Sequence, residues 1–257
     1  MKILLTAVNA KYIHSNLGIY SLKAYADQAL GAGEAGARND RAKKRETGTC
    51  REGPAEPFIE LAEYTINHQP DLILQDIFRR EPDVIAFSCY IWNIEYIRYL
   101  VADLGKILPD VPIWLGGPEV SFDAAKVLRE LPEVTGIMKG EGEETFAQLA
   151  GYYVDKRCEK RVGGGKRLPE RQAGLKDIPG LSFRLPDGSL ADTGVRQAMD
   201  MSRIPFPYKN MDIKDLEHRI IYYESSRGCP FSCSYCLSSI DKSVRFRSLE
   251  LVLDELA

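Results

Sequence analysis

Three cysteines within eight residues constrain this chain more than any other feature. Cys229, Cys233 and Cys236 follow a C-x3-C-x2-C spacing, and thiolates are soft ligands that suit iron–sulfur clusters, zinc and Cu(I). Three thiolates on one short loop can hold three corners of an iron–sulfur cubane and leave the fourth iron open. A closed structural zinc site would take a fourth ligand, usually from a second Cys/His pair, and none follows in the sequence. Zinc, or three small buried cysteines without a metal, are the alternatives.

The cysteine loop resembles the cluster loop of the radical S-adenosylmethionine (SAM) enzymes, and Tyr235 occupies the aromatic position before the third cysteine. In that family the three thiolates ligate a [4Fe–4S] cluster, and the open iron binds SAM. One electron then cleaves SAM to give a 5′-deoxyadenosyl radical. The resemblance implies that Cys229, Cys233 and Cys236 are the cluster ligands and that Tyr235 lies near the adenine of SAM.

The sequence around the cysteine loop has the pattern of a βα unit. Residues 220–223 are apolar and aromatic, which predicts a strand, and Ser248 is a good N-cap for a helix over 249–256. By the resemblance, residues 218–257 are the start of a radical SAM (β/α) barrel, with the chemistry at the carboxyl end of the strand. Only residues 237–257 follow the loop, whereas a full barrel takes roughly 250 residues. We therefore expect the N-terminal part of a longer enzyme, inactive alone.

Residues 1–154 alternate strand-like and helix-like segments, which predicts an α/β domain with a doubly wound, Rossmann-like parallel sheet. The strand-like runs are continuously apolar, as expected of strands buried on both faces. The expected strands are 3–8, 58–61, 83–88, 111–115 and 136–139, and the expected helices are 17–30, 71–80, 94–108, 122–131 and 144–154. Residues 31–57 lack large apolar side chains over most of their length, which predicts a mobile insertion.

Residues 155–217 are predicted to link the two domains. The first part is Gly-rich and basic, which indicates a flexible linker. A phosphate-binding loop is the alternative, but the Walker Gly-Lys-Ser/Thr context is absent. Alternating residues around Pro186, Asp187 and Gly188 predict a β-hairpin over about 178–195.

Candidate cofactor contacts follow three of the predicted strands at their carboxyl ends, where ligands bind in such sheets. These candidates are Ser88 and Tyr90, then Gly116 and Gly117, and then Glu141 in an acidic turn. Two adjacent glycines let a backbone approach a ligand closely, although a Gly-Gly pair by itself equally indicates a tight turn. A nucleotide-like ligand would suit the same edge.

This pattern resembles the cobalamin (B12)-binding domain, which carries a Ser-x-Leu element and, about a helix and a strand later, a Gly-Gly pair. Tyr90 stands where the family has Leu. The family's cobalt-ligating Asp-x-His-x-x-Gly motif is absent, since His14 lies in the corresponding loop without an Asp at the right spacing. The resemblance implies that Ser88 supports the tail of cobalamin and that the glycines admit it. It also implies cobalamin bound without a protein imidazole as lower ligand.

Composition and the other cysteines narrow the setting. The net charge is −3, so no global charge favours a nucleic acid or a membrane as partner. No apolar run approaches the length of a membrane span, and no signal peptide is recognisable. Cys50, Cys89 and Cys158 are scattered and suggest no disulfide framework. A reducing cytoplasm is the expected location.

Together the two resemblances identify a cobalamin-dependent radical SAM enzyme that methylates, or otherwise modifies by a radical route, an unactivated carbon. Its expected cofactors are a [4Fe–4S] cluster, SAM and cobalamin. The two resemblances also imply a one-electron donor such as flavodoxin or ferredoxin, and a small-molecule or peptide substrate. One alternative is a non-catalytic module that binds cobalamin or a cluster. Another is a zinc-stabilised or nucleic-acid-binding protein.

Overall fold

A seven-stranded sheet forms the centre of the protein. The computed structural model describes residues 1–10, 14–41, 58–162, 174–209 and 211–257. The strand order is β2-β1-β3-β4-β5-β6-β7. The strands are β1 Lys2–Asn9, β2 Phe58–Thr65, β3 Val84–Ser88, β4 Ile113–Gly116, β5 Gly136–Met138, β6 Leu181–Arg184 and β7 Leu190–Asp192. The first five are parallel, β6 pairs antiparallel with β5, and β7 pairs antiparallel with β6.

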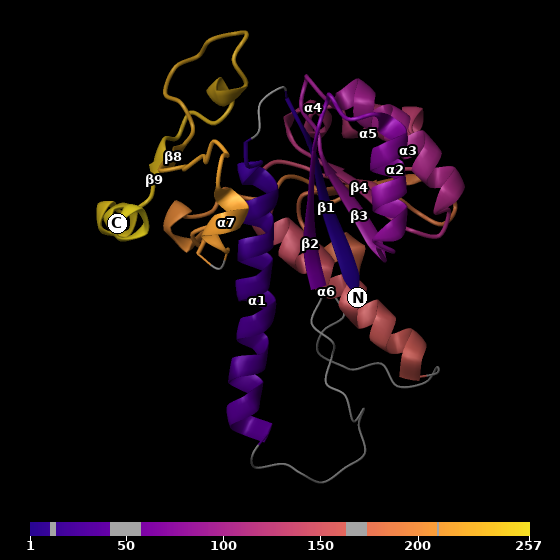
Figure 1. Cartoon of the computed structure of the whole chain (residues 1–257), viewed down its shortest axis with the longest axis horizontal. Coiled ribbons are helices and arrows are strands. Elements are labelled where there is room, and N and C mark those ends of the chain that lie inside the picture. Colours follow the sequence, from indigo (N-terminus) through magenta and orange to yellow (C-terminus); the bar gives the residue numbers. More distant parts are fainter. Residues whose placement is uncertain (11–13, 42–57, 163–173, 210) are drawn as a thin grey trace.

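Helices cover both faces of the sheet, as Figure 1 shows. They are α1 Leu17–Arg41, α2 Pro70–Arg79, α3 Ile94–Ile107, α4 Pro118–Ser121, α5 Ala124–Glu130 and α6 Glu143–Val162. One apolar cluster lies between the sheet and α2, α3 and α5, and a second lies between the sheet and α1 and α6. Strand β1 is buried from Ile3 to Asn9, as a central parallel strand covered on both faces should be. The expected doubly wound α/β fold is confirmed.

The strand order places a topological switch point between β1 and β3. The connection from β1 runs outward to β2, and the chain then returns to the other side of β1 at β3. Ligands bind at such a point, outside the carboxyl ends of the strands. In Figure 1 these ends lie at the top, away from the N-terminus.

Several predicted helices differ in length. Helix α1 continues to Arg41 rather than ending at residue 30, and the remaining part of the expected insertion, 42–57, lies outside the described residues. The expected helix 122–131 is instead two short helices, α4 and α5, because Pro118 starts a turn early and Asp123 has a non-helical backbone. Helix α6 extends to Val162, well into the expected linker.

The predicted β-hairpin is present, but it belongs to the sheet rather than to a separate linker. Strand β6 pairs with β5, so that Phe183 lies opposite Gly136. A side chain at Gly136 would overlap the ring of Trp114, so glycine is needed where these strands meet. Leu181 and Phe183 are buried against Trp114 and the α6 side chains. The hairpin therefore extends the hydrophobic core of the first domain.

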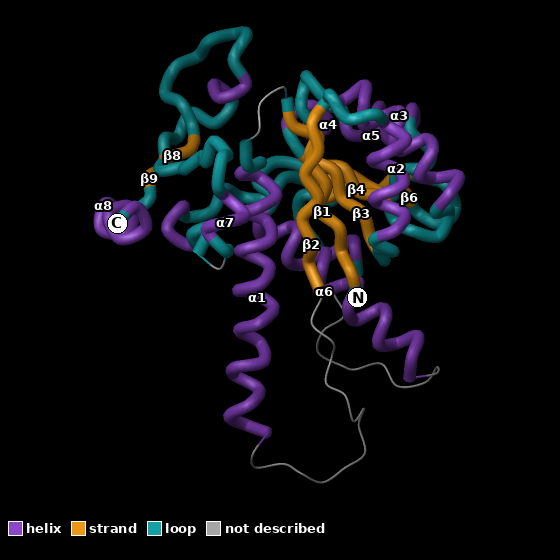
Figure 2. Tube along the Cα trace, viewed as in Figure 1, coloured by secondary structure: helices purple, strands orange, loops and turns teal. Residues whose placement is uncertain are grey.

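The C-terminal segment contains little regular structure, as Figure 2 shows. Its elements are α7 Ile213–Leu216, β8 Ser226–Arg227, β9 Arg245–Phe246 and α8 Leu249–Leu256. The predicted strand 220–223 is wrong, because this stretch makes one isolated bridge, from Ile220 to His14. Ile220, Ile221 and Tyr222 are about half exposed, so neither a ladder nor burial supports a strand there.

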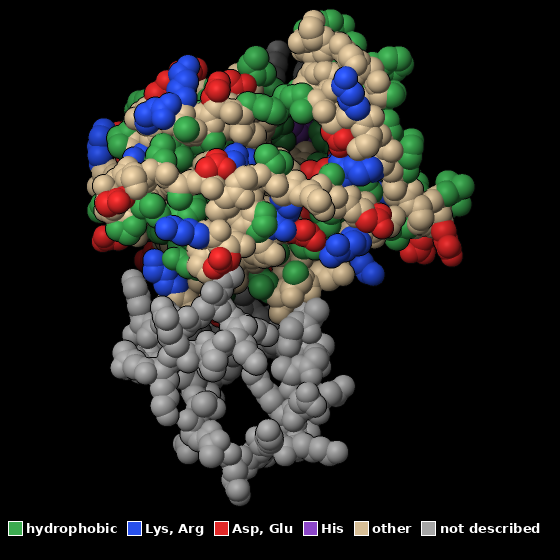
Figure 3. Space-filling view, turned by 180° about the vertical axis from the view of Figure 1, so that it is seen from behind, with side chains coloured by type: hydrophobic (Ala, Val, Ile, Leu, Met, Phe, Trp, Pro, Cys, Tyr) green, Lys and Arg blue, Asp and Glu red, His purple; other side chains and the backbone are tan. Residues whose placement is uncertain are grey.

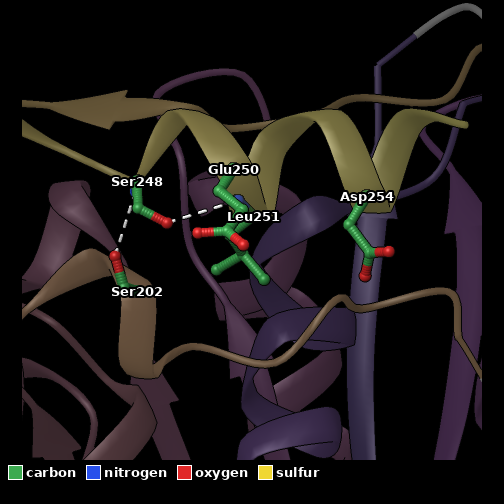
Figure 4. A pocket seen from close by; sticks show the side chains of 5 residues that line it. All are labelled: Ser202, Ser248, Glu250, Leu251 and Asp254. Carbon is green, nitrogen blue, oxygen red and sulfur yellow. Dashed lines mark hydrogen bonds between the residues drawn. The ribbon is translucent and has the colours of Figure 1, made fainter.

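Helix α8 forms as predicted, with the Ser248 hydroxyl accepting a hydrogen bond from the backbone N–H of Leu251 at 3.3 Å. Figure 4 shows a pocket beside this helix, lined by Ser202, Ser248, Glu250, Leu251 and Asp254. The pocket lies on α8 and the 201–203 turn, not at the carboxyl ends of the strands. Nowhere in the described ranges does a helix have both the length and the hydropathy for a bilayer crossing.

Candidate cofactor edge and cysteine loop

Asn93 joins the two strands of the switch point. Its side-chain amide donates to the carbonyl oxygens of Val8, at 2.9 Å, and of Ser88, at 3.0 Å. Its amide oxygen accepts from the backbone N–H of Tyr90 at 2.7 Å. The side chain is almost fully buried, so these bonds fix the ends of β1 and β3 relative to each other. This role could not be predicted from the sequence, because an Asn before a helix is simply typical of an N-cap.

The stretch after β3 carries an aromatic pair. The rings of Tyr90 and Trp92 are stacked, with centroids 4.5 Å apart and an interplanar angle of 7°. Burial raises the pKa of Tyr90 above its usual value, and a hydrogen bond with Ser88 opposes this. Ile91 and Trp92 expose apolar surface at this edge. Two predicted contacts, Ser88 and Tyr90, therefore lie together beside an apolar surface suited to a flat organic group.

Gly116 and Gly117 differ in what requires glycine. Gly117 has φ +105°, and a Cβ there would overlap the carbonyl oxygen of Cys89, so its own packing demands glycine. A Cβ on Gly116 would lie 3.6 Å from Met138 Cε, which is ordinary contact. The packing of the chain would therefore tolerate a small side chain in place of Gly116. Gly116 stays a predicted cofactor contact, and the neighbouring Cys89, whose burial raises its pKa to about 12, is an inert thiol.

The acidic turn after β5 is partly committed to other partners. A Cβ on Gly140, which has φ +70°, would meet nothing within 4 Å, so its outer side is open. Glu141, by contrast, is paired with Arg245 and lies 3.7 Å from Arg227. The structure therefore places Glu141 against the C-terminal segment and not alone at the edge. Its assignment as a cofactor contact stays a prediction.

His14 lies in the first loop but is held by its neighbours. Its Nδ1 is 3.1 Å from the carbonyl oxygen of Ser15, and a carbonyl can only accept, so Nδ1 carries the proton of this bond. The ring packs edge-on to Tyr222 at 5.5 Å between centroids. Beside it, Glu63 accepts hydrogen bonds from the backbone N–H of Asn16, at 2.8 Å, and from Arg219 Nη1, at 2.6 Å.

The base of the cysteine loop is closed by several short-range contacts. Strands β8 and β9 pair antiparallel, and the Cys229 backbone N–H donates to the carbonyl oxygen of Asp241 at 2.9 Å. Gly228 has φ +94°, and a Cβ there would overlap the carbonyl oxygen of Ser243, so only glycine lets the two arms approach. Figure 2 shows the resulting closed loop with one short helical turn.

The three thiols lie on this loop without converging. Cys233 is exposed, Cys229 and Cys236 are partly exposed, and all three are free of disulfides. Within the part of the chain that the structure describes, no three Cys, His, Asp or Glu side chains are grouped to hold a metal ion. Three free thiols on one accessible loop match an iron–sulfur cluster in number and chemistry, and their role as its ligands stays a prediction. Tyr235 is 91% exposed, pointing into solvent.

The cofactor edge and the cysteine loop lie at the same end of the molecule. In Figure 1 both are at the top, with the loop of residues 228–244 beside the carboxyl ends of the strands. Figure 3, seen from behind, shows a recess between this loop and the body of the protein. On the face shown there, basic and acidic side chains are interspersed, with no large patch of one sign.

The chain resembles several known proteins. The family model of the B12 binding domain matches residues 3–150. An uncharacterised methyltransferase of Pyrococcus horikoshii, PH0819, is 30% identical over an alignment of 199 residues that covers 73% of this chain and 39% of that protein. The cobalamin-dependent radical SAM methyltransferase TokK of Streptomyces tokunonensis is 27% identical over an alignment of 165 residues that covers 61% of this chain and 22% of TokK. The chain thus spans less than half the length of these relatives.

A solved structure has the same fold. OxsB, a cobalamin-dependent SAM radical enzyme determined with aqua-cobalamin and SAM bound, superposes with a TM-score of 0.66 at 17% sequence identity. The match covers 99% of this chain and 31% of OxsB. The fold match therefore includes the C-terminal segment with the three cysteines as well as the sheet. Since the family model covers more than half of the sequence, this chain belongs to the family of B12-binding-domain proteins, alongside cobalamin-dependent radical SAM enzymes.

Proposed function

We propose that this chain supplies the cobalamin- and SAM-binding part of a cobalamin-dependent radical SAM enzyme, most simply a methyltransferase. The observation that carries the proposal is the placement of the cysteine loop beside the carboxyl ends of a B12-binding fold. A methyl donor and a radical source have to face one substrate. One recess between these two elements suits that requirement.

The residues at the edge divide the binding of cobalamin between them. Gly116 leaves room for close backbone approach, Gly117 shapes the turn, and Ser88 offers a hydroxyl. Tyr90, stacked on Trp92, adds an apolar wall that excludes water. The bond to Ser15 leaves Nε2 of His14 without a proton, so the contact by itself does not exclude cobalt ligation. The absence of the Asp-x-His-x-x-Gly motif is what favours cobalamin bound without this imidazole as lower ligand.

The cysteine loop would hold the second cofactor. Cys229, Cys233 and Cys236 would ligate a [4Fe–4S] cluster, and exposed Tyr235 would lie against the adenine of SAM. When bound, the cluster would supply reductive cleavage of SAM, and cobalamin would supply methyl transfer. The chain's own contribution is to orient both groups and to exclude water between them. An external flavodoxin- or ferredoxin-like donor would provide the electron, in a reducing cytoplasm.

Metal and cobalamin analysis of the chain tests the proposal. After anaerobic reconstitution with iron and sulfide, we expect about four iron atoms and four sulfides per chain, and a shift in the visible spectrum on titration with hydroxocobalamin. Cys233→Ala should lose the cluster and keep cobalamin binding, because the two sites lie on separate elements. Zinc without sulfide in the purified chain would contradict the proposal and favour a zinc-stabilised protein.

A non-catalytic cobalamin-binding module is the second candidate. It is favoured by the family match, which ends at residue 150 and so contains the whole candidate cobalamin edge but none of the three cysteines. The two candidates differ in the cluster. Cobalamin binding by a chain that takes up no iron and sulfide on anaerobic reconstitution would favour the module.

A further inference from the structure

The ribbon at the base of the cysteine loop has an unfavourable charge pairing. Strands β8 and β9 are two residues each, and their register places Arg227 directly opposite Arg245. Like charges directly opposite each other destabilise an antiparallel pair, and an isolated two-stranded ribbon is marginally stable at best. The ribbon therefore needs support from elsewhere in the molecule.

Glu143 provides the first part of that support. Its Oε1 accepts from Arg227 Nη2 at 2.5 Å, and its Oε2 lies 3.3 Å from Arg227 Nη1, so the pair is bidentate. The Glu143 side chain is only 4% exposed and also accepts from the Ser21 hydroxyl on α1 at 3.1 Å. Bidentate Arg–carboxylate bonds fix orientation as well as distance. Arg227 is thereby joined to both α1 and the start of α6.

Glu141 connects the two arginines. Its Oε2 is 3.2 Å from Arg245 Nη1 and 3.7 Å from Arg227 Nη1, and its Oε1 accepts from Arg245 Nη2. Oε2 also accepts from the backbone N–H of Met199 at 3.2 Å. Both carboxylate oxygens are therefore used within the chain. This explains the acidic turn without a cofactor contact at Glu141.

Two further carboxylates complete the arrangement. Glu224 accepts from Arg227 Nε at 2.8 Å, and Asp241 accepts from Arg245 Nη2 at 2.9 Å. Both lie on the C-terminal segment itself, close in sequence to the arginines they bind. They balance charge locally but cannot attach the ribbon to the sheet. Of these four carboxylates, Glu141 and Glu143, after the carboxyl end of β5, are the two that do so.

We propose that Glu141 and Glu143, with Arg227 and Arg245, form a positioning clamp that fixes the base of the cysteine loop at the cofactor edge of the sheet. Arg227 stands two residues before Cys229, so its orientation sets the direction in which the loop leaves the ribbon. These four are positioning residues, since they act on the loop and not on the reacting groups. A role of the clamp in catalysis rests on the proposed function. The attachment of the loop to the sheet does not depend on that function.

Hydrogen exchange in the metal-free full chain tests the clamp directly. In Glu143→Gln, the backbone N–H groups of Cys229 and Arg247, which bond to Asp241 and Ser225 across the base of the loop, should lose protection by about tenfold or more. The N–H groups of β1 should change by less than about twofold, because the sheet does not depend on the clamp. The matched control is Glu130→Gln, which removes the more exposed Arg98 pair and should leave Cys229 and Arg247 unchanged.

A second variant keeps the test decisive if Glu143→Gln does not fold. Arg227→Lys retains the charge but cannot form the bidentate bonds, so protection at Cys229 should fall to an intermediate level. Unchanged protection at Cys229 in both variants would overturn the clamp. Equal loss of protection across β1 and the loop would also overturn it, because the pair would then support the whole fold.

The reconstituted chain gives a separate readout of orientation. If the clamp positions the loop, Arg227→Lys should bind iron and sulfide like the wild type and show a broadened EPR signal when reduced with SAM present. A signal identical to that of the wild type would contradict a positioning role. A wild-type chain that takes up no iron and sulfide would defeat the proposed function, while the exchange result would still decide the clamp.

Discussion

The sheet domain and the C-terminal segment are stabilised in opposite ways. The sheet buries two large apolar clusters, which include fully buried Trp114 and Phe87. In the C-terminal segment, from residue 209 onward, Arg247 is the one residue that is buried among those whose burial is described. The segment is held instead by arginines, through Arg219 to Glu63 and Arg227 to Glu143.

This difference separates stability from orientation. Apolar burial is non-directional and roughly proportional to area, so it keeps the sheet folded without specifying fine geometry at its edge. Arginine–carboxylate pairs contribute less to stability but hold a fixed geometry. The segment that carries the cysteines is thus attached by the interactions that best define direction.

The largest effect should come from the core of the sheet domain. Trp114→Ala removes a fully buried ring whose Nε1 donates to the Tyr153 hydroxyl at 2.9 Å, and it should cost about 3–5 kcal/mol. Chemical denaturation followed by circular dichroism measures this. Phe122→Ala is the control, since Phe122 is 61% exposed and its loss should change stability by less than about 0.5 kcal/mol.

A buried arginine of the C-terminal segment should have a local effect of up to about 3 kcal/mol. Arg247 donates to the carbonyl oxygens of Met201, at 3.1 Å, and Ile204, at 2.9 Å, and pairs with Glu255. Arg247→Ala should therefore speed proteolysis within residues 211–257 and leave the denaturation midpoint of the sheet unchanged. Arg203→Ala, which removes an exposed side chain, is the control. A lower midpoint would mean that the two regions unfold together.

The two glycines of the cofactor edge should respond differently. Gly117→Ala forces a side chain into a left-handed backbone and against Cys89, which should cost about 2 kcal/mol or more. Gly116→Ala should change stability by less than about 0.5 kcal/mol, yet weaken cobalamin binding by about tenfold through steric contact. Denaturation and cobalamin titration of both variants measure these effects. Unchanged cobalamin affinity in Gly116→Ala would remove Gly116 from the site.

Acid should loosen the C-terminal segment before the sheet. Burial alone would raise the pKa of Glu143, but the hydrogen bonds and charge of Arg227 outweigh it and hold the pKa below its usual value. A carboxylate with a lowered pKa stabilises the fold above its unfolded pKa, about 4.3 for Glu, and this contribution is lost as the pH falls through the folded pKa. Burial raises the pKa of neighbouring Glu224, which partly offsets the loss.

Hydrogen exchange of Cys229 between pH 6 and pH 3.5, corrected for intrinsic rates, measures the acid effect. Protection at Cys229 should fall over this range earlier than protection in β1. Glu143→Gln should abolish the difference, because Gln does not titrate. Parallel loss of protection in both regions would show that charge does not distinguish them.

The sequence predicted the sheet because its signals are local. Continuous apolar runs such as 83–88 mark a parallel strand without reference to the rest of the chain, and Pro186 with Gly188 marks a hairpin turn. The same reasoning was wrong at residues 220–223, since an apolar run indicates a strand only where partners cover it. Residues 220–222 remain half exposed.

The rest depends on contacts between distant residues. Glu141 and Arg245 are 104 positions apart, and nothing near either one indicates the other. The pairing of β6 with β5 likewise needs the space above Gly136, which only the folded sheet reveals. The cysteine spacing predicts ligands by type, and their arrangement around a metal stays a prediction.

The hairpin formed by β6 and β7 also covers an edge of the sheet to which a strand of another molecule could otherwise pair. Without it, the parallel strand β5 would present unpaired backbone groups on which another chain could add a strand. The hairpin moves that border to β7, which has three residues and ends at Asp192. Asp192 is paired with Lys139, and a short border strand with a charged end is a poor template for edge-to-edge aggregation.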